Sequence, residues 1–73
     1  MAQEIVEVPL TGKIIKVEVK QGDKIKEGDT IVVLESMKME NPIVSTVDGT
    51  VSKVSVNVDQ VVKTGDTIAV IDY

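Results

Sequence analysis

The sequence predicts an all-β domain. Valine and isoleucine together supply 23 of the 73 residues and threonine supplies 6 more, whereas Tyr73 is the one aromatic residue. Stiff β-branched side chains at this density favour pleated strands and disfavour helices. Glycines that stand beside aspartate or threonine interrupt the apolar runs, as in turns between short strands. They are Gly12, Gly22, Gly28, Gly49 and Gly65.

The chain also repeats itself. Residues 12–34 align with residues 49–71 at a constant offset of 37 without a gap, and ten of the 23 positions are identical. Two copies are too few for a solenoid, and neither copy could bury its apolar face alone. The repeat therefore predicts one domain over residues 1–73, in which two half-repeats, 12–34 and 49–71, form a quasi-two-fold symmetric sandwich or flattened barrel.

The expected strands follow in order from the apolar runs. Pro9 lacks a backbone donor and should lie at a strand end or a sheet edge. The alternation of apolar and polar residues is interrupted once within residues 14–19 and once within residues 51–56. This predicts a bulge or sharp twist at the same place in both copies. Residues 30–34 and residues 43–47 should pair as the two arms of a hairpin that joins the copies.

The segment Glu35-Ser36-Met37-Lys38-Met39-Glu40 stands where this hairpin reverses. Two-residue hairpin loops favour Asn-Gly or Asp-Gly because their backbone needs positive φ, and Met37-Lys38 is neither. A residue choice that conflicts with local structure at an exposed tip often marks a functional site. The alternative is a short helical turn, although six residues stopped by Pro42 would make a marginal helix. Pro42 should itself lie at a strand end or edge.

The composition argues against several functions. The chain has no cysteine and no histidine, so it lacks disulfides, thiolate metal sites and the usual general base. Independent catalysis is therefore not expected. A net charge of −4 without any arginine argues against a nucleic-acid partner. No run approaches the roughly 20 apolar residues of a membrane span and no signal peptide is evident, so we expect a soluble, cytoplasmic chain without membrane insertion.

Lys38 presents a primary amine that can be acylated with loss of its charge. Lysine amines are almost fully protonated at neutral pH, so an acylating partner must remove a proton or supply an activated acyl group. No sequence neighbour would activate this amine, which favours a modification site chosen by a partner over a Schiff-base nucleophile. The alternative is a solvated lysine on an ordinary turn.

Met37 and Met39 flank this lysine symmetrically. Methionine side chains are flexible and polarizable, so they serve either as gap fillers or as surfaces that a partner recognises. The symmetric placement favours recognition, with gap filling as the alternative. The Gly-Asp pairs elsewhere lack the dense oxygen spacing of a calcium loop and should be turns.

The tip Glu35-Ser36-Met37-Lys38-Met39 resembles the biotin attachment motif, Glu then Ala or Ser then Met-Lys-Met, of biotin carboxyl carrier proteins and of the biotinyl domains of biotin-dependent carboxylases. Three further segments resemble the family's glycine motifs: Pro9-Leu10-Thr11-Gly12-Lys13-Ile14, Gly22-Asp23-Lys24-Ile25-Lys26-Glu27-Gly28-Asp29 and Asp48-Gly49-Thr50-Val51. The resemblance covers residues 5–73.

The resemblance implies a flattened barrel-sandwich of two four-stranded antiparallel sheets with quasi-two-fold symmetry, and it places Lys38 on an exposed hairpin away from both termini. It implies that a biotin protein ligase attaches biotin to Lys38 and that Glu35, Met37 and Met39 take part in ligase recognition. The biotinyl-lysine would swing between a biotin carboxylase and a carboxyltransferase, which passes the carboxyl group to an acyl-CoA or a keto acid. The chain would then be a non-catalytic carrier without a metal site, monomeric as an isolated domain.

Two departures from the family pattern affect turns. Asp59-Gln60-Val61 stands where the family often has Gly-Asp-x, so this turn needs Asn57 or Asp59 in a left-handed conformation. The loop 20–24 is too short for the protruding thumb of some acetyl-CoA carboxylase carriers, so the resemblance is closer to thumbless domains of pyruvate, propionyl-CoA and methylmalonyl-CoA enzymes.

Two other functions remain open. Lipoyl domains of 2-oxo acid dehydrogenases resemble this fold and also carry a lysine on the hairpin, usually with Asp before it and Ala after it. The related hybrid domains of efflux adaptors are unmodified interaction modules, and they lack a Met-Lys-Met tip. Met37 and Met39 favour biotin over both alternatives.

Overall fold

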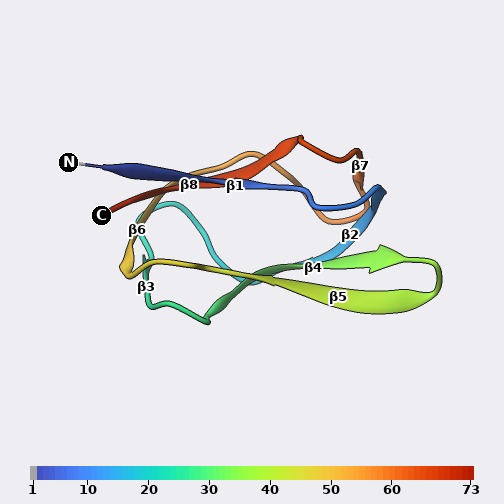
Figure 1. Ribbon diagram of the computed structural model, residues 1–73, viewed down its shortest axis with the longest axis horizontal. Helices are drawn as coiled ribbons and strands as arrows, with labels where there is room; N and C mark the ends of the chain where they lie inside the picture. Colours follow the sequence, from blue (N-terminus) through green and yellow to red (C-terminus); the bar gives the residue numbers. More distant parts are fainter. Residues whose placement is uncertain (1) are drawn as a thin grey trace.

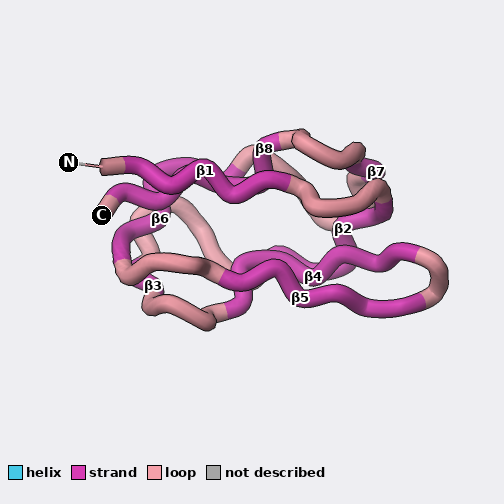
Figure 2. The backbone as a smooth tube through the Cα atoms, viewed as in Figure 1, coloured by secondary structure: helices cyan, strands magenta, loops and turns pink. Residues whose placement is uncertain are grey.

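The computed structural model describes residues 2–73, which form strands joined by turns and loops (Figures 1 and 2). The strands are β1 (Gln3–Glu7), β2 (Gly12–Val17), β3 (Lys24–Ile25), β4 (Thr30–Ser36), β5 (Met39–Val44), β6 (Gly49–Val54), β7 (Val61–Val62) and β8 (Thr67–Asp72). No helix is found within residues 2–73, and thus none that could cross a membrane. The all-β prediction is confirmed.

The strands form two four-stranded antiparallel sheets, with the orders β1-β8-β6-β3 and β5-β4-β2-β7. The offset of 37 residues carries β2, β3 and β4 onto β6, β7 and β8, so equivalent strands occupy opposite sheets. Among the described residues no strand of one sheet pairs with a strand of the other. The predicted two-sheet architecture is confirmed as a flattened sandwich that stays open at its edges.

An aliphatic core fills the space between the sheets. Equivalent positions of the repeat contribute to it together, for instance Ile31 with Ile68 and Leu34 with Ile71. Removal of these apolar surfaces from water is the main source of stability in a domain of this size. The buried residues are Val6, Val8, Ile14, Ile25, Ile31, Val32, Leu34, Val51, Val56, Val62, Ile68, Ala69 and Ile71.

The irregular alternation of the two copies has a structural cause. The register of β2 against β4 shifts between Ile14 and Lys16, and that of β6 against β8 shifts between Val51 and Lys53. An extra residue in one strand bends it and increases its twist. The predicted irregularity therefore occurs at equivalent places, and Ile14 and Val51 stay buried in the core.

Aspartate side chains close three of the four turns that flank the two short strands, β3 and β7. In each of these three turns a carboxylate oxygen accepts a hydrogen bond of 2.9–3.0 Å from the backbone N–H three residues earlier. The pairs are Lys20 with Asp23, Lys26 with Asp29 and Lys63 with Asp66. The Gly-Asp pairs are thus turn residues, as the sequence predicts.

Asp59 takes the place of a glycine in the fourth turn. Its φ is +73°, at the position equivalent to Gly22 with φ +95°, whereas Asn57 does not have a positive φ. The Gln60 side-chain oxygen accepts the hydrogen bond from the Asn57 N–H at 3.0 Å. Of the two residues expected to provide the left-handed conformation, Asp59 does so. Its carboxylate also pairs with Lys13 at 3.6 Å.

Gly12 and Gly49 allow close contact between neighbouring strands. A Cβ atom on Gly12 would overlap the backbone oxygen of Glu35, and one on Gly49 would overlap that of Asp72. Neither glycine has a positive φ, so these positions need glycine because it has no side chain and not because of its backbone conformation. Because Glu35 lies just before the hairpin turn, Gly12 helps to support the hairpin close to that turn.

We expect Gly12→Ala to lower the free energy of unfolding by about 1–3 kcal/mol, since the added methyl group must displace the β4 backbone. Urea unfolding followed by circular dichroism measures this. Lys16→Ala, at an exposed position of the same strand, serves as the control and should change stability by less than about 0.5 kcal/mol. Equal stability of the two variants would show that the close contact is unimportant.

Candidate functional site

The hairpin of β4 and β5 extends beyond the rest of the sandwich at one end of the molecule, and both termini lie at the other end (Figure 1). The molecule measures 36 × 18 × 17 Å. Ser36 pairs with Met39 across the hairpin, which leaves Met37 and Lys38 as its two loop residues. The predicted site residue Lys38 therefore occupies the extremity of the domain.

The loop backbone is left-handed at both of its residues. Met37 has φ +54° and Lys38 has φ +63°, the pattern of a type I′ turn. Residues without glycine's freedom lose about 1–2 kcal/mol each in this conformation. The alternative of a short helical turn is wrong, because the flanking strands continue up to the loop. Their pairing holds the loop in a conformation that its own residues disfavour.

The side chains at the tip point into solvent. Met37 is 90% exposed and Met39 is 66% exposed, so the alternative that they fill gaps in the core is wrong. Lys38 is exposed as well. The ion pair found among residues 2–73 joins Lys13 to Asp59 and does not involve Lys38. The Lys38 amine is therefore accessible to a partner.

Contacts beneath the tip attach it to the sandwich. The Ser36 hydroxyl donates a hydrogen bond of 3.0 Å to the backbone oxygen of Thr11, in the loop before β2. The Asn41 side-chain amide donates to the backbone oxygens of Leu34 at 3.4 Å and of Met39 at 3.2 Å. Sequence reasoning missed Thr11 and Asn41 as supporting residues. Thr11 had a signal, since it lies in the Pro-x-x-Gly segment, whereas Asn41 had none.

Glu35 lies on the outer face of the hairpin, because the preceding residue, Leu34, points into the core. Its cross-strand neighbours are Glu40 on one side and Lys13 on the other. Two like charges directly opposite each other are unfavourable, and Lys13 partly offsets that repulsion. Glu35 is exposed and thus accessible to the same partner as Lys38.

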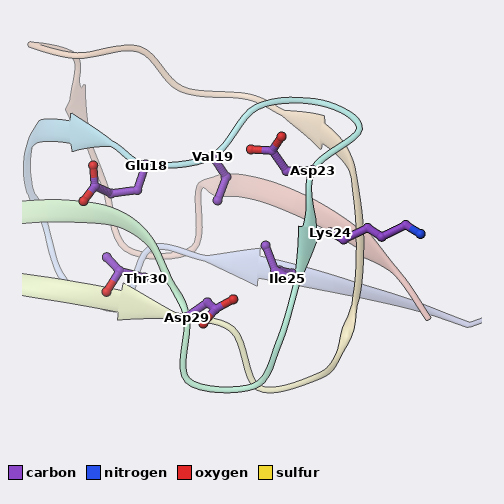
Figure 3. Close-up of a pocket in the computed structure, with 7 residues that line it drawn as sticks. All are labelled: Glu18, Val19, Asp23, Lys24, Ile25, Asp29 and Thr30. Carbon is purple, nitrogen blue, oxygen red and sulfur yellow. The ribbon is translucent and has the colours of Figure 1, made fainter.

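A separate polar hollow lies around β3 (Figure 3). Figure 1 shows β3 at the end of the molecule that also holds the termini. Two of its carboxylates, Asp23 and Asp29, accept the turn hydrogen bonds described above. Residues 2–73 contain no group of three or more acidic side chains placed to hold a metal ion. The residues that line the hollow are Glu18, Val19, Asp23, Lys24, Ile25, Asp29 and Thr30.

Comparisons with known proteins agree with this geometry. A family model described as "Biotin-requiring enzyme" matches residues 4–71. The chain is 51% identical over 39 residues to glutaconyl-CoA decarboxylase subunit gamma of Acidaminococcus fermentans, covering 53% of this chain and 27% of that subunit. It is 48% identical over 44 residues to the biotin/lipoyl attachment protein of Bacillus subtilis, covering 60% of each.

The fold is also similar to part of the urea carboxylase of Kluyveromyces lactis, with a TM-score of 0.91 and 30% identity over 99% of this chain and 6% of that one. The chain thus spans less than two thirds of the length of the relatives it matches. An exposed lysine amine outside any ion pair suits a cofactor attached through an amide. Since the family model covers nearly all of the sequence, the chain belongs to the family of biotin-requiring enzymes and is a biotinyl domain, with biotin as its cofactor.

Proposed function

We propose that this chain is a biotin carboxyl carrier in which Lys38 is the attachment residue. The observation that carries the proposal is the exposed, unpaired Lys38 amine on a two-residue turn at the far end of the domain. Strand pairing fixes the turn, while four rotatable bonds let the lysine side chain move. This combination suits a residue that must enter the active sites of partner enzymes.

In the proposed loading step, the Lys38 nitrogen attacks the acyl carbon of biotinyl-adenylate, which a biotin protein ligase makes from ATP and biotin. An amide bond forms, AMP leaves and the amine loses a proton. The domain contributes position, and the ligase contributes activation. Met37, Met39 and Glu35 are exposed and lie within three residues of Lys38, and we propose that the ligase recognises them there.

Once attached, biotin would carry a carboxyl group from a biotin carboxylase to a carboxyltransferase. The chain itself would be a non-catalytic carrier subunit or domain, since it has neither histidine nor cysteine to act as a base or nucleophile. Attachment to the domain raises the effective concentration of the cofactor at both active sites without tight docking. We infer that the isolated domain acts as a monomer in the cytoplasm.

The connection between β2 and β3 leaves the tip uncovered. The Gly22 N–H donates to the backbone oxygen of Val51 at 2.8 Å, and the Val51 N–H donates to the backbone oxygen of Asp23 at 2.8 Å. These hydrogen bonds hold the connection against β6, in the region of the termini (Figure 1). A cofactor on Lys38 would then contact little of the domain, as expected for thumbless biotinyl domains.

A lipoyl group is the second candidate for Lys38, because the same amine can form an amide with either acyl group. The relative from Bacillus subtilis bears both groups in its name, "Biotin/lipoyl attachment protein". The methionines on both sides of Lys38 favour biotin. An unmodified interaction module would have no need for a strained turn that presents a lysine.

We expect co-expression with a biotin protein ligase to add one biotin to the chain, because Lys38 offers an accessible amine. Intact-mass spectrometry measures this. Lys38→Arg should abolish the addition, whereas Lys63→Arg, at an exposed lysine on the sandwich, should leave it unchanged. An unmodified wild-type chain in the presence of active ligase would contradict the proposed function.

Met37→Ala and Met39→Ala should each slow ligation about tenfold or more, since each removes an apolar side chain that the ligase would bury. Both side chains are exposed, so the free energy of unfolding should change by less than about 0.5 kcal/mol. Single-turnover ligation and urea unfolding separate the two effects. A normal rate of ligation in both variants would exclude recognition of the methionines.

Lys38→Gly should be more stable than Lys38→Ala by about 1 kcal/mol, because glycine adopts φ +63° without the penalty that a Cβ atom brings. Both variants remove the amine, so their difference isolates the backbone. The midpoints of urea unfolding measure this difference, provided that the free energy of unfolding depends equally on urea concentration in both variants. If alanine proves as stable as glycine at this position, the turn is not strained in solution.

A further inference from the structure

Two of the three side chains in this chain that are most easily oxidised lie at its tip. The sequence contains no cysteine, histidine or tryptophan, so methionine thioethers are the main targets for a two-electron oxidant such as a peroxide. Met37 and Met39 flank Lys38 and are 90% and 66% exposed. The third methionine, Met1, is far from the tip in sequence.

Neither of these two side chains supports the fold. The core cluster and the partly buried residues packed against it include neither Met37 nor Met39. Both lie at the turn of the β4–β5 hairpin, and that end of the hairpin extends beyond the sandwich (Figure 1). Oxidation usually damages a protein because it makes a core methionine polar. Here the added oxygens would lie in solvent, so the sandwich should stay intact.

We propose that Met37 and Met39 form a reversible oxidation site that controls the loading of Lys38. The inference rests on the proposed function and adds a regulatory step to it. A peroxide transfers one oxygen to each thioether sulfur: the sulfur loses two electrons, the O–O bond breaks, and water or an alcohol leaves. Methionine sulfoxide reductases reverse the step, with a pair of protein thiols oxidised to a disulfide as the oxygen leaves in water.

The effect on loading follows from polarity and position. A sulfoxide is polar and chiral, so its transfer from water into an apolar pocket is unfavourable, whereas the transfer of a thioether is not. Met37 shares the two-residue loop with Lys38, and Met39 begins the strand that follows. We therefore expect a ligase that surrounds the Lys38 side chain to contact the two exposed methionine side chains as well. Oxidised chains should be poor substrates although their fold is unchanged.

The test uses the unmodified chain, hydrogen peroxide as the oxidant and a biotin protein ligase. After peroxide is removed, intact mass counts the added oxygens, circular dichroism checks the fold, and single-turnover assays give the rate of ligation. We expect at least a tenfold lower rate after oxidation. Treatment with reductases for both sulfoxide epimers should restore the rate.

The matched control is the Met37→Leu/Met39→Leu variant, which keeps apolar side chains of similar size but lacks sulfur at the tip. It retains Met1, so it reports any effect of oxidation outside the tip. Its rate of ligation should be the same before and after peroxide. The single variants Met37→Leu and Met39→Leu should each lose only part of the sensitivity of ligation to peroxide.

Two results would overturn the inference: an unchanged rate in fully oxidised wild-type chain, or an equal loss of rate in the double leucine variant. A chain that accepts no biotin even before peroxide treatment would instead overturn the proposed function. The assay without oxidant therefore separates the two failures.

Discussion

This domain depends on one constraint: its β-branched side chains must be buried between two sheets, each of which contains strands from both halves of the chain. Each sheet takes strands from both copies of the repeat, so neither copy can bury its apolar face until the other is in place. A fully buried valine, isoleucine or leucine contributes about 1.5–3 kcal/mol. A chain of this length has little stability to spare, so the halves must fold together.

The strained turn is possible because of this arrangement. Met37 and Lys38 both disfavour the left-handed conformation that the turn imposes, but β4 is an inner strand that pairs with β2 as well as with β5 and so holds the turn in place. The Ser36–Thr11 hydrogen bond and the close contact of Gly12 with the Glu35 backbone add support from outside the hairpin. The rigid sandwich thus presents one lysine without any covering segment, at some cost in local stability.

Much of this structure could be predicted from the sequence, because the information is local or periodic. The density of β-branched residues indicated strands, the offset of 37 indicated the symmetry, and the missing glycine indicated a left-handed residue at Asn57 or Asp59, of which the structure shows Asp59. Contacts across strands could not be predicted in the same way. The hydrogen bond from Ser36 to Thr11 and the opposition of Glu35 and Glu40 depend on register, which a bulge in β2 and the hairpin loop determine together.

The backbone pairing of the two chain ends has a consequence for how far the lysine can reach. Ala2 and Tyr73 exchange two backbone hydrogen bonds of 2.9 Å. The offset of 37 residues relates Ala2 to Met39 and Tyr73 to Ser36, the pair that flanks the hairpin turn. The chain ends therefore occupy the end of the molecule that is symmetry-equivalent to the turn. Polypeptide joined to either chain end would leave from that end of the molecule, so the whole long axis of 36 Å would act as a rigid spacer between such a tether and the attachment residue.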